Sequence, residues 1–157
     1  METTWDLTPL FPGLESPEFQ RAWEGLKGRI GELKGLLERE APLPEVLAAL
    51  DAFLEEATPL RAYLYARYSA DTRDEAALAK LSELEILFLD FQRRRPRLTR
   101  YLALKDPEEA GPYRLLVEEA KEEALHMMPE GEEVLAAELS LSGRAAWDKL
   151  HESLTSQ

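Results

Sequence analysis

The chain has 157 residues, and its 31 acidic side chains outnumber its 19 basic ones, which gives a formal net charge of −12. This length fits one domain or two small ones, and a hydrophobic content of 45% is enough for a buried core, which excludes a wholly disordered protein. The acid excess argues against nucleic acid and anionic membranes as partners, and the absence of cysteine excludes disulfide scaffolds and cysteine nucleophiles.

The first predicted element is an extended arm at residues 1–16, followed by one helical domain at residues 17–157. Ser16 and Pro17 mark the boundary, because serine accepts hydrogen bonds from first-turn amides and proline suits the first helical position. Apolar residues at steps of three and four then predict a helix to about Arg39. Three glycines of this helix lie three residues apart, a spacing that lets another helix approach closely: Gly25, Gly28 and Gly31.

Proline and glycine divide the remaining helices. A second helix begins near Glu45 and is expected to stop or kink at Pro59, because proline lacks an amide donor and its ring clashes with the preceding turn. A nearly continuous apolar and aromatic segment covers residues 60–69, and a long helix is expected at about residues 75–95.

Proline and glycine also mark the helix boundaries in the last third of the chain. A short helix follows Pro96, and Gly111 interrupts the next helical segment. Pro129 starts another helix, and Gly143 precedes the last one. In this last helix four residues are expected to point inward: Ala146, Trp147, Leu150 and Leu154.

These elements predict an all-α fold, an antiparallel bundle of about five to seven helices with an extended N-terminal arm. No segment alternates polar and apolar residues as a strand does. No apolar run approaches the ~20 residues of a membrane span, and the N-terminus lacks the pattern of a signal peptide, so we expect no membrane partner and a cytoplasmic protein. Three methionines and no asparagine or cysteine are typical of a thermophile.

Two histidine motifs were considered as metal sites. His151 and Glu152 begin like the His-Glu-x-x-His helix of zinc peptidases, but Thr155 occupies the second histidine position. Glu123 and His126 have the Glu-x-x-His spacing of di-iron bundles, which need a second such pair and two further carboxylates. A di-metal carboxylate bundle built on this pair is therefore a third alternative for the function.

The remaining candidates favour structural roles. Residues 93–97 form the only basic run, and we expect it at a helix carboxyl end, paired with acidic side chains elsewhere. Tyr63, Tyr65 and Tyr68 have helical spacing, which is typical of core or interface residues.

Three stretches of the chain together resemble the N-terminal region of oligoendopeptidase F, a family of zinc metallopeptidases that cleave oligopeptides. Residues 5–12 read Trp-Asp-Leu-Thr-Pro-Leu-Phe-Pro, and residues 63–72 carry the tyrosines and end in Ser-Ala-Asp-Thr. Residues 126–156 resemble the family's His-x-Leu step, glutamate-rich helix, Leu-x-Gly-x-x-Ala-Trp motif and closing Leu-Thr. Met128 departs from the usual leucine of the His-x-Leu step.

The resemblance implies an all-helical lobe that caps one side of a deep substrate channel, admitting short peptides and excluding folded proteins. The family's zinc ligands and catalytic glutamate lie in a later catalytic domain that has no counterpart in these 157 residues. No catalytic, cofactor-binding or metal residue is therefore transferred to this chain, and we expect it to be inactive by itself.

We therefore predict the N-terminal helical domain of an oligoendopeptidase F-like zinc metalloendopeptidase, which shapes and gates the oligopeptide channel. Its expected partners are the catalytic peptidase domain or oligopeptides, with homodimers promoted by apolar helix surface. The alternative from another class is a stand-alone helical protein–protein interaction module. Six aromatic residues are expected to anchor the arm, the bundle or an interface: Trp5, Phe11, Tyr63, Tyr65, Tyr68 and Trp147.

Overall fold

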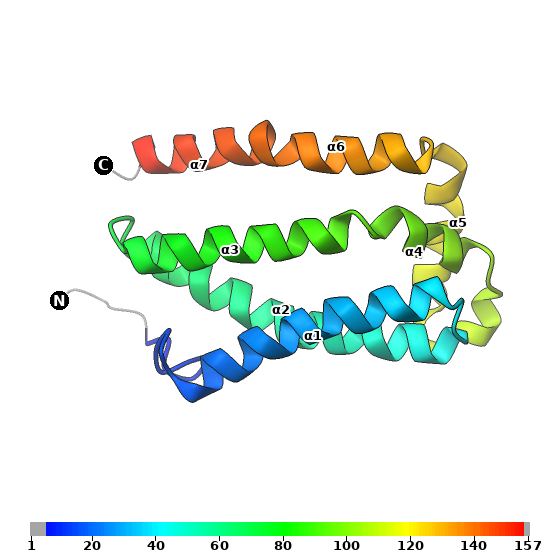
Figure 1. Ribbon diagram of the computed structural model, residues 1–157, viewed down its shortest axis with the longest axis horizontal. Helices are drawn as coiled ribbons and strands as arrows, with labels where there is room; N and C mark the ends of the chain where they lie inside the picture. The colour runs from blue at the N-terminus through cyan, green and yellow to red at the C-terminus, as the bar shows by residue number, and fades with distance from the viewer. Residues whose placement is uncertain (1–5, 156–157) are drawn as a thin grey trace.

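The computed structural model describes residues 6–155, apart from the side chains of Leu141, Ser142, Ala145 and Glu152. Every regular element in this range is a helix, which confirms the predicted all-α class (Figure 1). In chain order the elements are α1 (Pro17–Glu38), α2 (Leu43–Ala70), α3 (Glu75–Gln92), α4 (Arg95–Ala103), the 3-10 helix η1 (Pro107–Tyr113), α5 (Arg114–His126), α6 (Glu130–Ser142) and α7 (Arg144–Thr155).

The start of α1 follows the predicted cap. Pro17 opens the helix, and the Ser16 hydroxyl oxygen accepts a hydrogen bond from the Phe19 amide at 3.2 Å. The segment before it packs on the bundle through Phe11, whose ring lies edge-on against Phe19 at 5.4 Å and Tyr63 at 5.3 Å between ring centroids. The arm therefore contributes to the core instead of lying free on the surface.

The second helix differs from the prediction, because α2 runs through Pro59 without stopping. Ala57 and Leu60 on either side of the proline are buried, so tertiary packing offsets the hydrogen bond that proline cannot donate. The ribbon of α2 changes direction between its two halves (Figure 1), as expected for a helix with an internal proline.

The core lies mainly between α1 and α2, and α3, α4 and α5 close it. The hydroxyl of Tyr101 on α4 donates a buried hydrogen bond to the Ala41 carbonyl at 2.6 Å, which fastens the second half of the chain to the α1–α2 turn. Gly111 has a φ of 55° and interrupts η1, which confirms the predicted break.

The last two helices lie along α3 but bury little (Figure 1). No α6 or α7 side chain that the structure describes is buried. The prediction that the last helix points its apolar residues inward is wrong, since Trp147 is 71% exposed and Leu154 is 64% exposed. Lys149 on the inner side of α7 pairs with Glu85 of α3, and the opposite side of the helix, which carries Trp147 and Leu154, faces outward.

Among the described residues, no helix combines the length and the apolar character that crossing a membrane requires.

Candidate functional site

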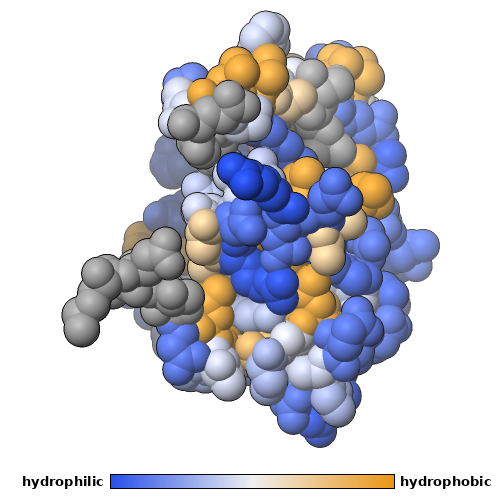
Figure 2. All heavy atoms as spheres, turned by 90° about the vertical axis from the view of Figure 1, so that its left-hand side faces the viewer, coloured by the Kyte–Doolittle hydropathy of each residue, from blue (hydrophilic) through white to orange (hydrophobic). Residues whose placement is uncertain are grey.

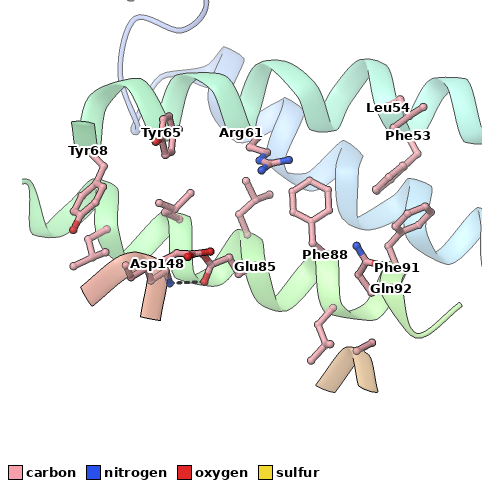
Figure 3. Close-up of a pocket in the computed structure, with 16 residues that line it drawn as sticks. Phe53, Leu54, Arg61, Tyr65, Tyr68, Glu85, Phe88, Phe91, Gln92 and Asp148 are labelled. Atoms are coloured by element: carbon pink, nitrogen blue, oxygen red, sulfur yellow. Dashed lines mark hydrogen bonds and ion pairs between the residues drawn. The ribbon is translucent and has the colours of Figure 1, made fainter. Parts of the chain in front are cut away.

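A groove of about 510 Å³ lies between α2 and α3, with α6 and α7 along its outer side (Figure 3). Its volume falls in the range of small-molecule and peptide pockets. Aromatic rings dominate its walls, and Phe53 of α2 stacks on Phe91 of α3 at a centroid distance of 4.5 Å. Phe88 meets Phe53 edge-on at 6.1 Å, so aromatic rings form the wall at this end of the groove.

Among the side chains that the structure describes on the last two helices, those that line the groove are small or charged. They are Ala137 of α6 and Asp148 and Lys149 of α7. An alanine fills little of the space between helices. The most exposed apolar side chains described on these helices, Leu139, Trp147 and Leu154, do not line the groove.

The charges in the groove are balanced except at one residue. Lys149 Nζ lies 2.5 Å from Glu85 Oε2, and Asp148 Oδ2 lies 3.7 Å from Arg144 Nε outside the groove. Arg61 extends from α2 into the groove (Figure 3). It makes neither a hydrogen bond nor an ion pair with any part of the chain that the structure describes. One guanidinium group is thus available to an anionic ligand.

The end of the groove near the α2–α3 turn is fixed by Arg67. Its guanidinium donates to Asp74 Oδ2 at 2.6 and 2.9 Å and to the Tyr63 hydroxyl at 3.2 Å. Asp74 also caps α3, because its Oδ1 accepts from the Ala77 amide at 2.9 Å. Burial opposes ionisation of Asp74, but the Ala77 amide and the Arg67 guanidinium outweigh it and hold the pKa of this carboxyl below its usual value. These contacts set the position of α3 against α2.

The predicted aromatic residues have different environments. Phe11 and Tyr63 are buried, and their rings are in contact. Tyr65 and Tyr68 both line the groove, where Tyr68 is buried and Tyr65 is 51% exposed. Trp147 lies on the outer side of α7, and Trp5 lies outside the described residues.

Arg61 was missed in the sequence. The segment 60–69 contains two charged residues, Arg61 and Arg67, and Arg67 pairs within the chain. The sequence does not distinguish the two arginines, because the groove depends on α3, α6 and α7, which are distant in the sequence.

The two residues considered for a di-metal site have different environments. Glu123 Oε1 pairs with Arg95 Nη2 at 2.9 Å, and His126 ends α5 with an exposed side chain. Among the side chains that the structure describes, no group of three or more acidic or histidine residues is arranged to hold a metal ion. The carboxylate constellation of a di-metal bundle is therefore not assembled around this pair.

The basic run is placed as predicted. Arg93 follows the last residue of α3, and its Nη2 pairs with Glu138 Oε1 of α6 at 2.8 Å. Arg94 donates a hydrogen bond to the Asp90 carbonyl at the end of α3. With Arg95 paired to Glu123, these cations bind the carboxyl end of a helix and acidic partners, as the sequence indicated.

A second exposed feature is the outer face of α6 and α7. We use the term outer face for five large apolar residues that are 46–71% exposed: Leu135, Leu139, Trp147, Leu150 and Leu154. Their spacing of three or four residues within each helix puts them on one side. Figure 2 shows apolar side chains gathered at the top of the molecule, over α7. Contiguous apolar surface of this kind marks an interaction site.

Comparison with known proteins gives one match. Residues 100–157 match a family model described as Oligopeptidase F, which represents the N-terminal domain of these peptidases. The match extends from α4 to α7 and includes the outer face. It supports an N-terminal domain of oligoendopeptidase F-like peptidases and covers one of the three resembling stretches, residues 126–156. No curated protein and no solved structure matches the chain.

Proposed function

We propose that this N-terminal domain docks on the catalytic domain of an oligoendopeptidase F-like zinc metalloendopeptidase and shapes and gates its oligopeptide channel. The observation that carries the proposal is the family match at residues 100–157, because it falls on the same helices that expose the outer face. The zinc ion and the catalytic glutamate are supplied by the catalytic domain, and this chain is not catalytic by itself.

The outer face is suited to docking. Trp147, at 71% exposed, offers a large side chain that is typical of the residues that dominate binding energy at interfaces. Leucines flank it on both helices, and each buried Å² of apolar surface stabilises a complex by about 25 cal/mol before the cost of association. The opposite side of the same helices lines the groove.

The way α6 and α7 are held supports the proposed gating role. Their contacts to α3 include the ion pairs Arg93–Glu138 and Lys149–Glu85, whose side chains are all partly exposed. Ion pairs of this kind contribute at most about 1 kcal/mol each. Since neither helix buries a described side chain, we expect α6 and α7 to shift relative to α3 at low cost and so to widen or narrow the groove.

The test is complementation of a catalytic domain that lacks its own N-terminal helices. We expect added chain to bind this domain and to raise hydrolysis of a quenched fluorescent peptide, whereas the chain alone with zinc hydrolyses nothing. Leu154→Asp places a charge in the outer face and should abolish the gain. Leu104→Asp is the matched control, because Leu104 is 87% exposed on the end of α4 and lies away from the outer face. Absence of both binding and stimulation would contradict the proposal.

The outer face also fits the alternative of a helical interaction module, in which a second copy covers it. In that case the chain alone forms dimers in analytical ultracentrifugation, Leu154→Asp makes it monomeric, and the catalytic domain does not bind. The two functions are therefore separated by the same pair of variants.

A further inference from the structure

We propose that the groove between α2 and α3 binds the C-terminal carboxylate of a short peptide at Arg61, with an apolar C-terminal side chain against Phe88. The choice of a peptide as the ligand rests on the proposed function. The site itself rests on charge, shape and the chemistry of the groove walls.

The charge argument begins with the pairing of the groove residues. Glu85 and Lys149 neutralise each other, and Asp148 has Arg144 as a partner. Arg61 is the charged group that lines the groove without an ionic partner among the side chains that the structure describes. A carboxylate accepts two parallel hydrogen bonds from a guanidinium, which is the geometry that favours arginine over lysine for this ligand.

The shape argument rests on two adjoining hollows. A second hollow of about 380 Å³ follows α2 and shares four residues with the groove: Leu54, Arg61, Tyr65 and Phe88. Arg61 therefore stands where the two hollows meet, with an aromatic ring nearby on each helix (Figure 3). A ligand that combines an anionic end with an apolar side chain matches this arrangement.

The length of the groove gives the size of the peptide. Phe53 precedes Arg61 by eight residues on α2, and a helix rises 1.5 Å per residue, so about 12 Å of helix axis separates them. An extended chain covers about 3.3–3.6 Å per residue, so this distance holds three or four peptide residues. The Phe53 end is walled by stacked rings, which suits apolar side chains.

The opposite direction is unfavourable for a longer chain. Asp148 lies with Tyr65 and Tyr68 on the other side of Arg61 (Figure 3). If Arg61 instead bound an acidic side chain in the middle of a long peptide, the peptide backbone would continue past Arg61 toward the Asp148 carboxylate. A C-terminal carboxylate ends the peptide at Arg61, so we assign the recognised group to the C-terminus.

The experiment measures binding to the intact chain by fluorescence anisotropy. The probes are a fluorescein-labelled pentapeptide ending in leucine and phenylalanine with a free carboxylate, the same peptide with a C-terminal amide, and the amide with glutamate in place of the phenylalanine. We expect the free acid to bind at least about tenfold more tightly than both amides, as for a charge-assisted hydrogen bond.

Arg61→Gln should weaken binding of the free acid about tenfold or more and remove its advantage over the amide. Arg97→Gln is the matched control, because Arg97 is exposed on α4, lies outside the groove and has no ion pair within the described chain. It should leave the binding of all three probes unchanged.

The proposal is overturned if the amide binds as tightly as the acid, if the glutamate amide equals the acid, if Arg61→Gln and Arg97→Gln act alike, or if no probe binds at millimolar concentration. Because this assay needs no catalytic domain, its failure leaves complementation free to succeed. Failure of complementation alone leaves peptide binding intact.

Discussion

An alanine in place of Gly28 should stabilise the protein. Gly28 is an exposed residue inside α1, and apart from the neighbouring backbone of its own helix no described atom lies within 4 Å of the place that a β-carbon would occupy. Glycine in a helix interior is about 0.5–1 kcal/mol less favourable than alanine, because it loses more backbone entropy on folding. For a chain of this length, 1 kcal/mol corresponds to about 2–4 °C in Tm.

Gly25 is the matched control, only one turn away on the same helix. A β-carbon there would overlap Oε2 of Glu56 on α2, an oxygen that is buried without a hydrogen-bond partner among the described residues. The other oxygen of Glu56 accepts from Arg29 Nε at 3.1 Å. Gly25→Ala must move this carboxylate and disturb that pair, so its rise in Tm should be smaller than that of Gly28→Ala or should become a fall.

The assay is thermal unfolding followed by circular dichroism, with urea unfolding to obtain the free energy of unfolding of each variant. Equal shifts for Gly25→Ala and Gly28→Ala would contradict the expected cost of moving the Glu56 carboxylate away from the new β-carbon. If Gly28→Ala destabilised the protein, the surface of α1 at Gly28 would not be free of contacts with other elements.

Two further predictions concern single contacts, and a third concerns the attachment of α6 and α7. Tyr101→Phe should lower the free energy of unfolding by about 1–3 kcal/mol, because the buried Ala41 carbonyl loses its donor. Tyr68→Phe is the control, since the Tyr68 hydroxyl has no hydrogen-bond partner within the described chain, and it should change this free energy little in the same urea series. Asp74→Ala should cost about 1 kcal/mol by removing the cap of α3. Since the pKa of Asp74 is lowered on folding, its contribution is present above its usual value of 3.8 and is lost as the pH falls through the folded pKa, so a pH series of urea unfolding should show a weaker acid dependence for the variant. Amide hydrogens of α6 and α7 should exchange faster than those of α1 and α2 in hydrogen-exchange mass spectrometry, and equal protection would contradict their loose attachment.

The sequence predicted the features that depend on local chemistry. Ser16 and Pro17 start α1, and Gly111 breaks η1, because capping and a positive φ are decided by the residue itself and its neighbours. The all-α class followed from the apolar spacing for the same reason. These features need no knowledge of what lies across the bundle.

Other features depend on distant parts of the chain and were not predictable in this way. Pro59 stays inside α2 because buried neighbours hold the helix together. Trp147 faces outward, while Lys149 on the other side of α7 pairs with Glu85 of α3. Periodicity identifies an apolar side of a helix, but it does not tell whether that side meets the core or a partner. Arg61 belongs to a groove whose walls come from four helices.

The two sides of α6 and α7 connect docking with peptide binding. One side supplies Ala137, Asp148 and Lys149 to the groove, and the other side carries the outer face. A partner that binds the outer face fixes the position of both helices, and therefore the outer wall of the groove. If a peptide at Arg61 favours the same helix position, each ligand increases the affinity of the other by the same factor. Titrating the labelled peptide with and without the catalytic domain measures this factor. A factor of one would mean that the groove and the outer face act independently, and that gating requires a motion elsewhere in the bundle.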